Sequence, residues 1–170
     1  MRKQIDSIFV YLFFIACWIF FFYFYPYHLH YKEQITLCVL QPDFLQTYLQ
    51  KPAFLTEICG DYLTQFFLWT GGGSSILTLT FVFTWLGLRI ALRKTGITNH
   101  VSLWALLPIV AEWALSCHLE YPLSMSLGLM CSVWAFSLST LSTSTRTRGI
   151  LHVVMLTILY CAVGAHFFAY

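Results

Sequence analysis

Long stretches without a charged side chain alternate with short charged segments along this chain. Lys, Arg, Asp and Glu are absent from residues 7–31, 62–88, 121–145 and 149–170. A fifth apolar stretch, near residues 101–118, contains one charged residue, Glu112. A helix needs about 20 apolar residues to cross the hydrocarbon core of a bilayer. The pattern therefore predicts an all-α, polytopic membrane helix bundle with about five transmembrane helices, at residues 7–27, 74–92, 101–118, 123–142 and 150–169.

The loop between the first two predicted spans, residues 28–73, has a different pattern. Over residues 53–69, pairs of apolar residues alternate with pairs of polar or small residues. Because a helix has 3.6 residues per turn, these pairs form a broad apolar stripe on one side. A shorter amphipathic segment starts at Pro42, and Pro52 prevents its continuation. We expect two amphipathic helices lying in the plane of the membrane surface.

Composition and charge support this architecture and its orientation. Hydrophobic residues make up 59% of the 170 positions and charged residues 9%, whereas an ordinary soluble domain has about 25% charged residues. With the N-terminus in the cytoplasm, seven of the nine basic residues lie on the cytoplasmic side: Arg2, Lys3, Arg89, Arg93, Lys94, Arg146 and Arg148. This follows the positive-inside rule, so the basic charge gives no reason to expect a nucleic-acid partner.

The segment YPYHLHYKEQ, residues 25–34, has two possible structures with different chemistry. On a helix, His28 and His30 point apart, whereas His30 and Glu33 share a face. On a strand, His28 and His30 align and could bind a metal ion together. In a third interpretation, these side chains only solvate the end of the first transmembrane helix.

Carboxylates supply the candidate catalytic residues. Glu57 and Asp61 lie four residues apart, so they project from the same side of the predicted helix. With His30 and Glu33 predicted on the same membrane surface, they form a candidate site for general acid–base chemistry. Glu112 lies within a predicted span, where it is either a functional residue or a carboxyl group bonded to a neighbouring helix.

The segment TGGGSS, residues 70–75, separates the loop from the next predicted span. Its glycines allow a sharp reversal of the chain, and Ser74 or Ser75 can cap the following helix. Alternatively, the amides of Gly72, Gly73 and Ser74 could bind the phosphate of a cofactor or donor at the helix start. The segment lacks the Gly-Lys-Ser/Thr ending of a Walker loop.

Small residues and cysteines add two structural expectations. Ser124, Gly128 and Ser132 recur every four residues, which predicts close packing of this span against another helix. Cys38 and Cys59 share the non-cytoplasmic loop and could form a disulfide in an oxidising compartment. The chain ends in HFFAY without a polar tail, so we expect it to be the N-terminal part of a longer protein.

Several residues of the loop carry a resemblance to a known group of proteins. Tyr27-His28, Tyr31 and Glu33-Gln34, followed by Asp61-Tyr62, Thr64-Gln65-Phe66-Phe67 and the glycine-rich turn, resemble the N-terminal region of an uncharacterised family of multi-pass inner-membrane proteins from Bacteroidota. The resemblance covers roughly residues 20–95. It implies a multi-pass protein of the bacterial inner membrane and implies no reaction.

The layout of a first span, a large acidic loop and a series of further spans is also similar to that of polyprenyl-phosphate-sugar-dependent glycosyltransferases. This chain lacks the Asp-x-Asp or Asp-Glu pair that such enzymes carry in the loop.

Three functions are consistent with these patterns. The first is a structural or interaction module of an envelope assembly, with membrane lipid and either other membrane subunits or a second copy as partners. The second is a glycosyltransferase-like enzyme that uses a lipid-linked sugar, with Glu57 or Asp61 as general base and His30 or Glu33 assisting. The third is a cation-handling protein with His28, His30, Glu33 and Glu112 as ligands.

Overall fold

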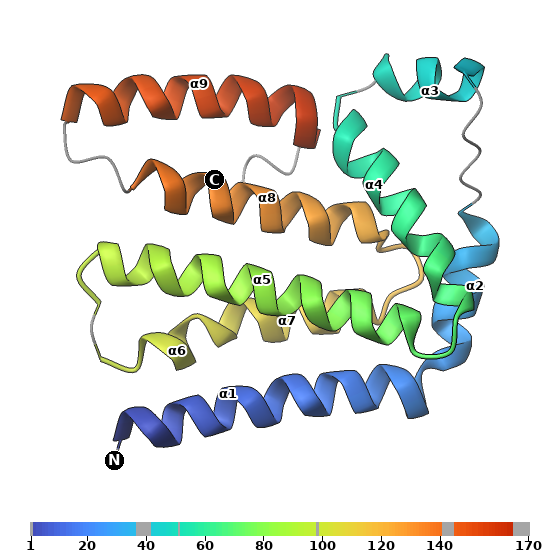
Figure 1. Cartoon of the computed structure of the whole chain (residues 1–170), viewed down its shortest axis with the longest axis horizontal. Helices are drawn as coiled ribbons and strands as arrows, with labels where there is room; N and C mark the ends of the chain where they lie inside the picture. The colour runs from blue at the N-terminus through green and yellow to red at the C-terminus, as the bar shows by residue number, and fades with distance from the viewer. Residues whose placement is uncertain (1, 37–41, 51, 98, 141–144, 165–170) are drawn as a thin grey trace.

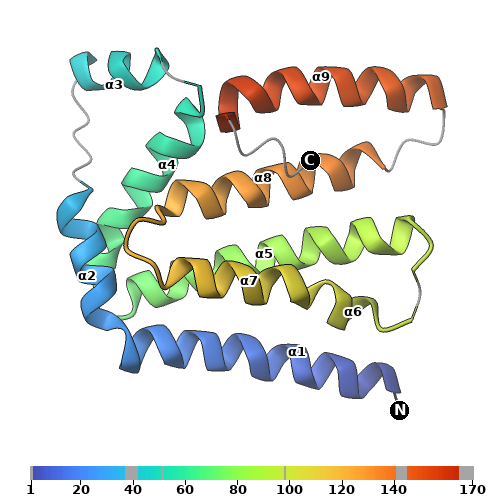
Figure 2. The ribbon, with the colours of Figure 1, turned by 180° about the vertical axis from the view of Figure 1, so that it is seen from behind.

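The described part of the chain is helical. The computed structural model describes residues 2–36, 42–50, 52–97, 99–140 and 145–164. Four long helices, α1 (Arg2–Ile19), α5 (Gly72–Lys94), α8 (Leu123–Ser139) and α9 (Thr145–Val163), lie side by side in that order as a flat array (Figure 1). Two further helices, α6 (Val101–Trp104) and α7 (Leu106–Ser116), lie beside α5 on one face of the array (Figure 2).

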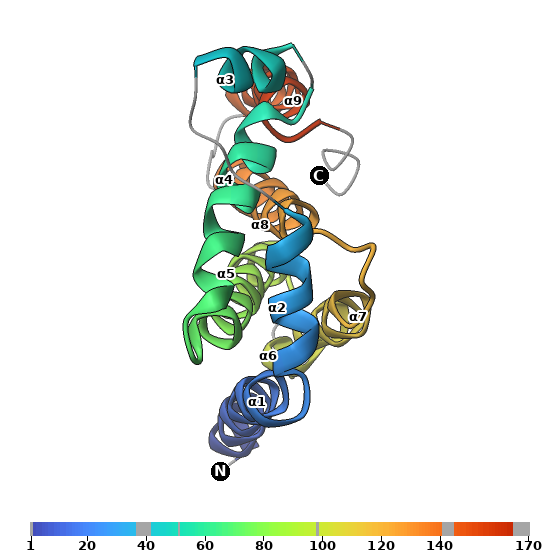
Figure 3. The ribbon, with the colours of Figure 1, turned by 90° about the vertical axis from the view of Figure 1, so that its right-hand side faces the viewer.

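Two shorter helices cross one end of this array. These are α2 (Pro26–Ile35) and α4 (Phe54–Thr64), which run across the ends of the long helices and which we call the end layer (Figure 3). Helix α3 (Pro42–Leu49) contacts α4, and a 3₁₀ turn (Gln65–Leu68) connects α4 to the start of α5. The structure confirms the two amphipathic helices expected after Pro42 and Pro52, although the second ends as an α-helix at Thr64 rather than at residue 69, and α2 adds a further helix within the predicted loop.

The first long helix is shorter than the predicted span 7–27. It continues from α1 as a π-helical segment, Phe20–Phe24, and the N–H of Tyr25 donates to the carbonyl of Phe20 at 3.1 Å. Pro26 then starts α2, because the residue before a proline disfavours helical geometry. Since residues 28–34 are helical, the strand alternative for the two histidines is wrong.

The predicted span 101–118 is also divided, into α6 and α7. Pro108 lies in the first turn of α7, where its missing N–H is tolerated, but its ring prevents α6 from continuing unbroken. By length and composition, two of the described helices could cross a membrane, at Asp6–Phe24 and Gly72–Lys94. The other three predicted spans coincide with shorter apolar helices, at Val101–Ser116, Leu123–Ser139 and Gly149–Val163.

The small side of α4, rather than its apolar stripe, faces the protein. Thr56, Gly60 and Thr64 are buried, whereas Leu55 and Tyr62 are nearly half exposed. Residues four apart share one side of a helix, so these small residues form a continuous contact surface. The amphipathic pattern correctly predicted the helix. It did not predict that the side with the small residues would be buried against the rest of the protein.

Helix α8 is the centre of the array and packs through small residues, as its sequence predicted. Ser124, Ser132 and Gly128 are buried, and a Cβ added at Gly60 of α4 would lie 2.8 Å from the backbone nitrogen of Ser124. On the neighbouring side, the Ser137 hydroxyl donates to the carbonyl of Gly87 in α5 at 2.7 Å. Close backbone approach of this kind requires glycine or serine at the contact.

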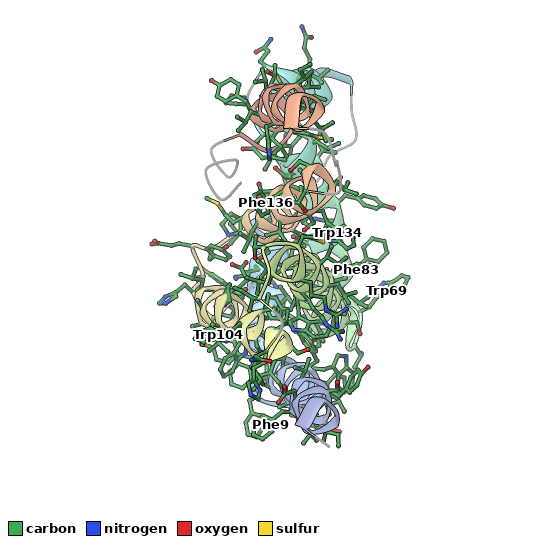
Figure 4. All side chains as sticks on the ribbon, turned by 90° about the vertical axis from the view of Figure 1, so that its left-hand side faces the viewer. Phe9, Trp69, Phe83, Trp104, Trp134 and Phe136 are labelled. Atoms are coloured by element: carbon green, nitrogen blue, oxygen red, sulfur yellow. The ribbon has the colours of Figure 1, made fainter. Side chains whose placement is uncertain are left out.

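Buried hydroxyl groups recur across the array. Small hydroxyl-bearing residues are fully or nearly fully buried, namely Thr56, Thr64, Ser74, Thr80, Thr84, Ser116, Ser124, Ser126, Ser132, Ser137 and Ser139. Many large apolar side chains project outward, and Phe83 and Trp104 do so on opposite faces of the array (Figure 4). An apolar core of mainly aromatic residues fills the space between α1, α5 and α7: Val10, Phe14, Phe21, Phe81, Trp85 and Ile109.

Candidate functional site

A partly polar pocket of about 220 Å³ lies where α2 and α4 meet the ends of α7 and α8. We call it the end pocket. Its polar lining combines one cation, two carboxylates and several hydroxyl groups, contributed by Lys32, Thr36, Asp61, Thr64, Ser116, Glu120, Tyr121 and Ser126. Apolar side chains complete the lining: Ile35, Phe67, Leu77, Leu119, Pro122 and Leu123. The pocket therefore suits a ligand that has both polar and apolar parts.

Lys32 is the basic group of the end pocket. Its side chain is only 9% exposed, and its ammonium group donates to the carbonyls of Ser116 at 3.0 Å and Tyr121 at 2.9 Å. These two bonds tie α2 to the connection between α7 and α8. Burial disfavours the charged form and lowers the pKa of Lys32 to about 8.

Glu112 lies within the protein next to this pocket. Its carboxyl group is buried and accepts hydrogen bonds from the Tyr121 hydroxyl, at 2.9 and 3.0 Å to its two oxygens, and from the Ser126 hydroxyl at 2.5 Å. Burial, followed by the nearby Glu112, raises the pKa of Tyr121, so this hydroxyl keeps its proton and remains a donor. Of the two alternatives for Glu112, the structure shows the bonding that the structural one predicted.

Tyr121 connects the two buried charged residues. Its backbone carbonyl accepts from Lys32, while its hydroxyl donates to Glu112. Removing either charged residue therefore disturbs the position of the same tyrosine. A hydrogen-bonded chain extends from α2 through the α7–α8 connection to Ser126 on α8.

Asp61 is the sequence-predicted catalytic residue that lines the end pocket. Its carboxylate accepts a hydrogen bond of 2.5 Å from the hydroxyl of Tyr48 in α3. One helical turn later, the Gln65 amide donates to the carbonyl of Thr36 at 2.6 Å, which joins the end of α4 to the end of α2. The two helices of the end layer are thus held together around the pocket.

The other predicted catalytic and metal-binding residues lie elsewhere. Glu33 and Glu57 are partly buried and do not line the end pocket. His30 lines a pocket of about 90 Å³ beside the glycine-rich turn, whereas His28 lines an open hollow with His118 and Glu120. Within the described ranges, no group of three or more His, Cys, Asp or Glu side chains could hold a metal ion. The structure therefore does not bring the four proposed cation ligands together.

The glycine-rich turn starts α5 without a side-chain cap. Gly71 has φ +81° and precedes the helix, so the prediction that Ser74 or Ser75 caps it is wrong. The Ser75 hydroxyl instead accepts from the indole N–H of Trp18 at 3.1 Å, which links α5 to α1. A Cβ at Gly72 would collide with the carbonyl oxygen of Phe66. The phosphate-binding role of Gly72, Gly73 and Ser74 stays a prediction.

Two central residues of the site, Lys32 and Tyr121, were not predicted from the sequence. The available signal was that Lys32 is one of only two basic residues expected on the non-cytoplasmic side. Its hydrogen-bond partners are backbone carbonyl groups 84 and 89 residues later in the chain. Because every residue has a backbone carbonyl, no residue type in the sequence marks these partners. The predicted disulfide partner Cys38 lies outside the described residues.

The fold and the site together define an all-helical protein with candidate membrane helices and a buried polar network at one end. The chain belongs to a family of unknown function, DUF6057, which matches residues 2–170. The match extends beyond the stretch of residues 20–95 that carried the resemblance to an uncharacterised family. No curated protein and no solved structure matches the chain.

The lowered pKa of Lys32 predicts a pH dependence of stability. Between the folded-state pKa of about 8 and the unfolded value of about 10.4, the unfolded state binds the extra proton, so the free energy of unfolding rises with pH. From pH 7.5 to 10 we expect it to rise by about 2–3 kcal/mol more in the wild type than in Lys32→Met. Chemical unfolding in detergent micelles at several pH values measures this difference.

A matched control for this experiment is Lys94→Met, which removes an exposed lysine at the end of α5. Its unfolding curve should follow that of the wild type at every pH. Parallel pH profiles for the wild type and Lys32→Met would contradict the lowered pKa of Lys32.

Proposed function

We propose that this chain is an integral membrane protein that serves as a structural module of the bacterial envelope. The observation that carries the proposal is a combination: hydroxyl and small side chains are buried at helix contacts beside the apolar core, while many other large apolar side chains are exposed on the outside of the array. Because lipid tails are as apolar as the side chains, the hydrophobic effect does not drive helices together within a bilayer. Close packing of small residues and hydrogen bonds between helices stabilise their association instead. Membrane lipid is then the partner of both broad faces of the array.

The proposed topology has five membrane-crossing segments, formed by α1, α5, α6 with α7, α8 and α9. The N-terminus lies in the cytoplasm, and the end layer lies on the non-cytoplasmic surface of the inner membrane. Support comes from the partition of basic residues along the chain and from the orientation of α2 and α4 across the ends of the long helices (Figures 1 and 3). Helices α1 and α9 form the two edges of the array, where a second copy or another membrane subunit would bind.

Cysteine labelling in spheroplasts tests this topology. In a variant whose only cysteine is the exposed Cys59 of α4, a membrane-impermeant maleimide is expected to label intact spheroplasts. A second variant, with Lys94→Cys as its only cysteine, places the thiol at the opposite end of the array and should be labelled only after permeabilisation. Labelling of Cys59 only after permeabilisation would contradict the orientation, and recovery of the protein in the soluble fraction would contradict the membrane assignment.

A second candidate function is glycosyl transfer from a lipid-linked sugar, favoured by the shared position of Asp61 and Lys32 in the end pocket. Asp61 would accept the proton of an acceptor hydroxyl as this oxygen forms the new bond to the sugar carbon. The bond from that carbon to the phosphate oxygen breaks, and Lys32 would stabilise the negative charge on the departing lipid phosphate. The pocket contains hydroxyl groups suited to orient a sugar.

The enzyme hypothesis predicts different effects for two carboxylates that the sequence alone treated alike. Asp61→Asn should abolish the glycan that depends on this protein, while Glu57→Gln should leave it unchanged because Glu57 does not line the end pocket. Surface-glycan profiling of cells that carry each variant measures this. If cells that carry Asp61→Asn have the same glycan profile as the wild type, the glycosyltransferase hypothesis is excluded and the structural module remains as the proposed function.

A further inference from the structure

A second polar pocket lies at the opposite end of the array from the end layer. It has a volume of about 290 Å³ and is formed by the N-terminal part of α1, the C-terminal part of α5 and the start of α6 (Figure 1). We call it the basic pocket. Its lining consists of Asp6, Ser7, Arg89, Arg93, His100, Val101 and Ser102. Arg89 and Arg93 contribute to the charge partition behind the proposed topology, and the proposed functions give the pocket itself no role.

Arg89 is fixed in the wall of this pocket with an unused hydrogen-bond donor. Its guanidinium carbon lies 5.1 Å from the centre of the Trp85 ring, and the Trp85 indole is itself held by a 3.0 Å bond to the carbonyl of Ser102. The Nε–H of Arg89 is buried and has no hydrogen-bond partner among the described residues. An unsatisfied buried donor is unfavourable, so an acceptor at this position would stabilise the protein.

Arg93 adds a second guanidinium group one helical turn later. The carboxylate of the pocket, Asp6, contacts Nδ1 of His100 at 3.0 Å rather than either guanidinium group. Among the described residues, neither Arg89 nor Arg93 forms an ion pair with a carboxylate. The basic pocket therefore presents two arginines to an anion, with the hydroxyl of Ser102 nearby.

We propose that the basic pocket binds the phosphate group of an anionic ligand, and that this ligand is the headgroup of an anionic membrane lipid. Two guanidinium groups on one side of a helix match the oxygens of a phosphate ester through paired N–H donors. Basic pockets between membrane helices on the cytoplasmic side bind anionic headgroups. The choice of a lipid rests on the proposed membrane orientation, whereas the phosphate chemistry rests on the pocket alone.

Native mass spectrometry of the full chain in detergent, with phosphatidylglycerol or phosphatidylcholine added, tests this proposal. We expect the wild type to retain phosphatidylglycerol. The double variant Arg89→Gln/Arg93→Gln should bind this lipid about tenfold more weakly than the wild type does. Lys94→Gln removes a neighbouring exposed charge that does not line the pocket, and it should retain the lipid like the wild type. Equal retention of the two lipids by the wild type, with no effect of inorganic phosphate on its unfolding temperature, overturns the proposal.

Further measurements separate the sources of the phosphate and guard against misfolding. If inorganic phosphate raises the unfolding temperature of the wild type but not of the double variant, and phosphatidylglycerol is not retained, the phosphate site stands and the lipid is excluded. Arg89→Lys/Arg93→Lys keeps both charges and loses the paired donors, so its affinity for phosphatidylglycerol should fall several-fold. If the glutamine variant fails to fold, an unchanged affinity of this lysine variant overturns the proposal. The topology experiment on Cys59 fails or succeeds independently of these results.

Discussion

Replacing Glu112 with leucine (Glu112→Leu) is expected to reduce the free energy of unfolding by about 2–5 kcal/mol. The buried carboxyl group accepts hydrogen bonds from Tyr121 and Ser126, and both hydroxyls would lose their acceptor in the variant. Tyr121 also presents the carbonyl that binds Lys32, so the loss should extend to the contact between α2 and the α7–α8 connection. Unfolding of the detergent-solubilised protein in increasing SDS, followed by tryptophan fluorescence, measures the change.

Two further variants separate the loss of hydrogen bonds from the loss of the carboxyl group, and from a general effect of any substitution in this region on stability. Glu112→Gln keeps the shape and one acceptor oxygen, so its loss should be about 1–2 kcal/mol. Glu120→Gln changes an exposed carboxylate on the same connection and should alter stability by less than about 0.5 kcal/mol. A Glu112→Leu protein as stable as the wild type would show that the network through Tyr121 does not hold the α7–α8 connection in place.

Replacing Gly60 with valine (Gly60→Val) is expected to detach α4 from α8. An added Cβ would lie 2.8 and 2.9 Å from backbone atoms of Ser124, and a backbone cannot move aside as a flexible side chain can. Overpacking of this kind costs about 1–3 kcal/mol. Because Asp61 and Thr64 of α4 line the end pocket, we also expect the pocket to open. Hydrogen–deuterium exchange of residues 54–68, together with SDS unfolding, measures both effects.

The control for this variant is Gly149→Ala in α9. No atom lies within 4 Å of a Cβ added at Gly149, and alanine favours a helix over glycine by up to about 1 kcal/mol. Its stability should equal or slightly exceed that of the wild type. If Gly60→Val shows exchange in α4 no faster than Gly149→Ala does, the close contact between α4 and α8 is not a determinant of the fold.

The sequence predicted the helices of the loop because their ends have local causes. Pro42 and Pro52 delimit α3, and the alternation of paired residues identifies α4. It did not predict which side of α4 faces the protein, because the amphipathic rule assumes that water covers the polar side. Packing through Thr56, Gly60 and Thr64 depends on the close approach of Ser124, which lies far away in the sequence.

The candidate site was predictable only in part for the same reason. Asp61 was a candidate because it shares the polar side of its helix with Glu57, and Glu112 because it lies in an apolar stretch. The structure places both at or beside the end pocket. Glu57, Glu33 and His30 were grouped with Asp61 because they share a predicted membrane surface, and a shared surface does not specify distance. Lys32 was missed because backbone carbonyls bind it, and any residue can supply a carbonyl.

The central position of α8 has a consequence for how the protein is made. Helices α4, α5 and α9 all contact α8, and two of them, α4 and α5, precede α8 in the chain and leave the ribosome before it. Until Ser124 has emerged, α4 lacks the surface of α8 on which it docks, and its small side stays uncovered during synthesis. The docking of α4 therefore waits for the synthesis of α8, so a ribosome that stalls before residue 123 leaves a chain without its end pocket.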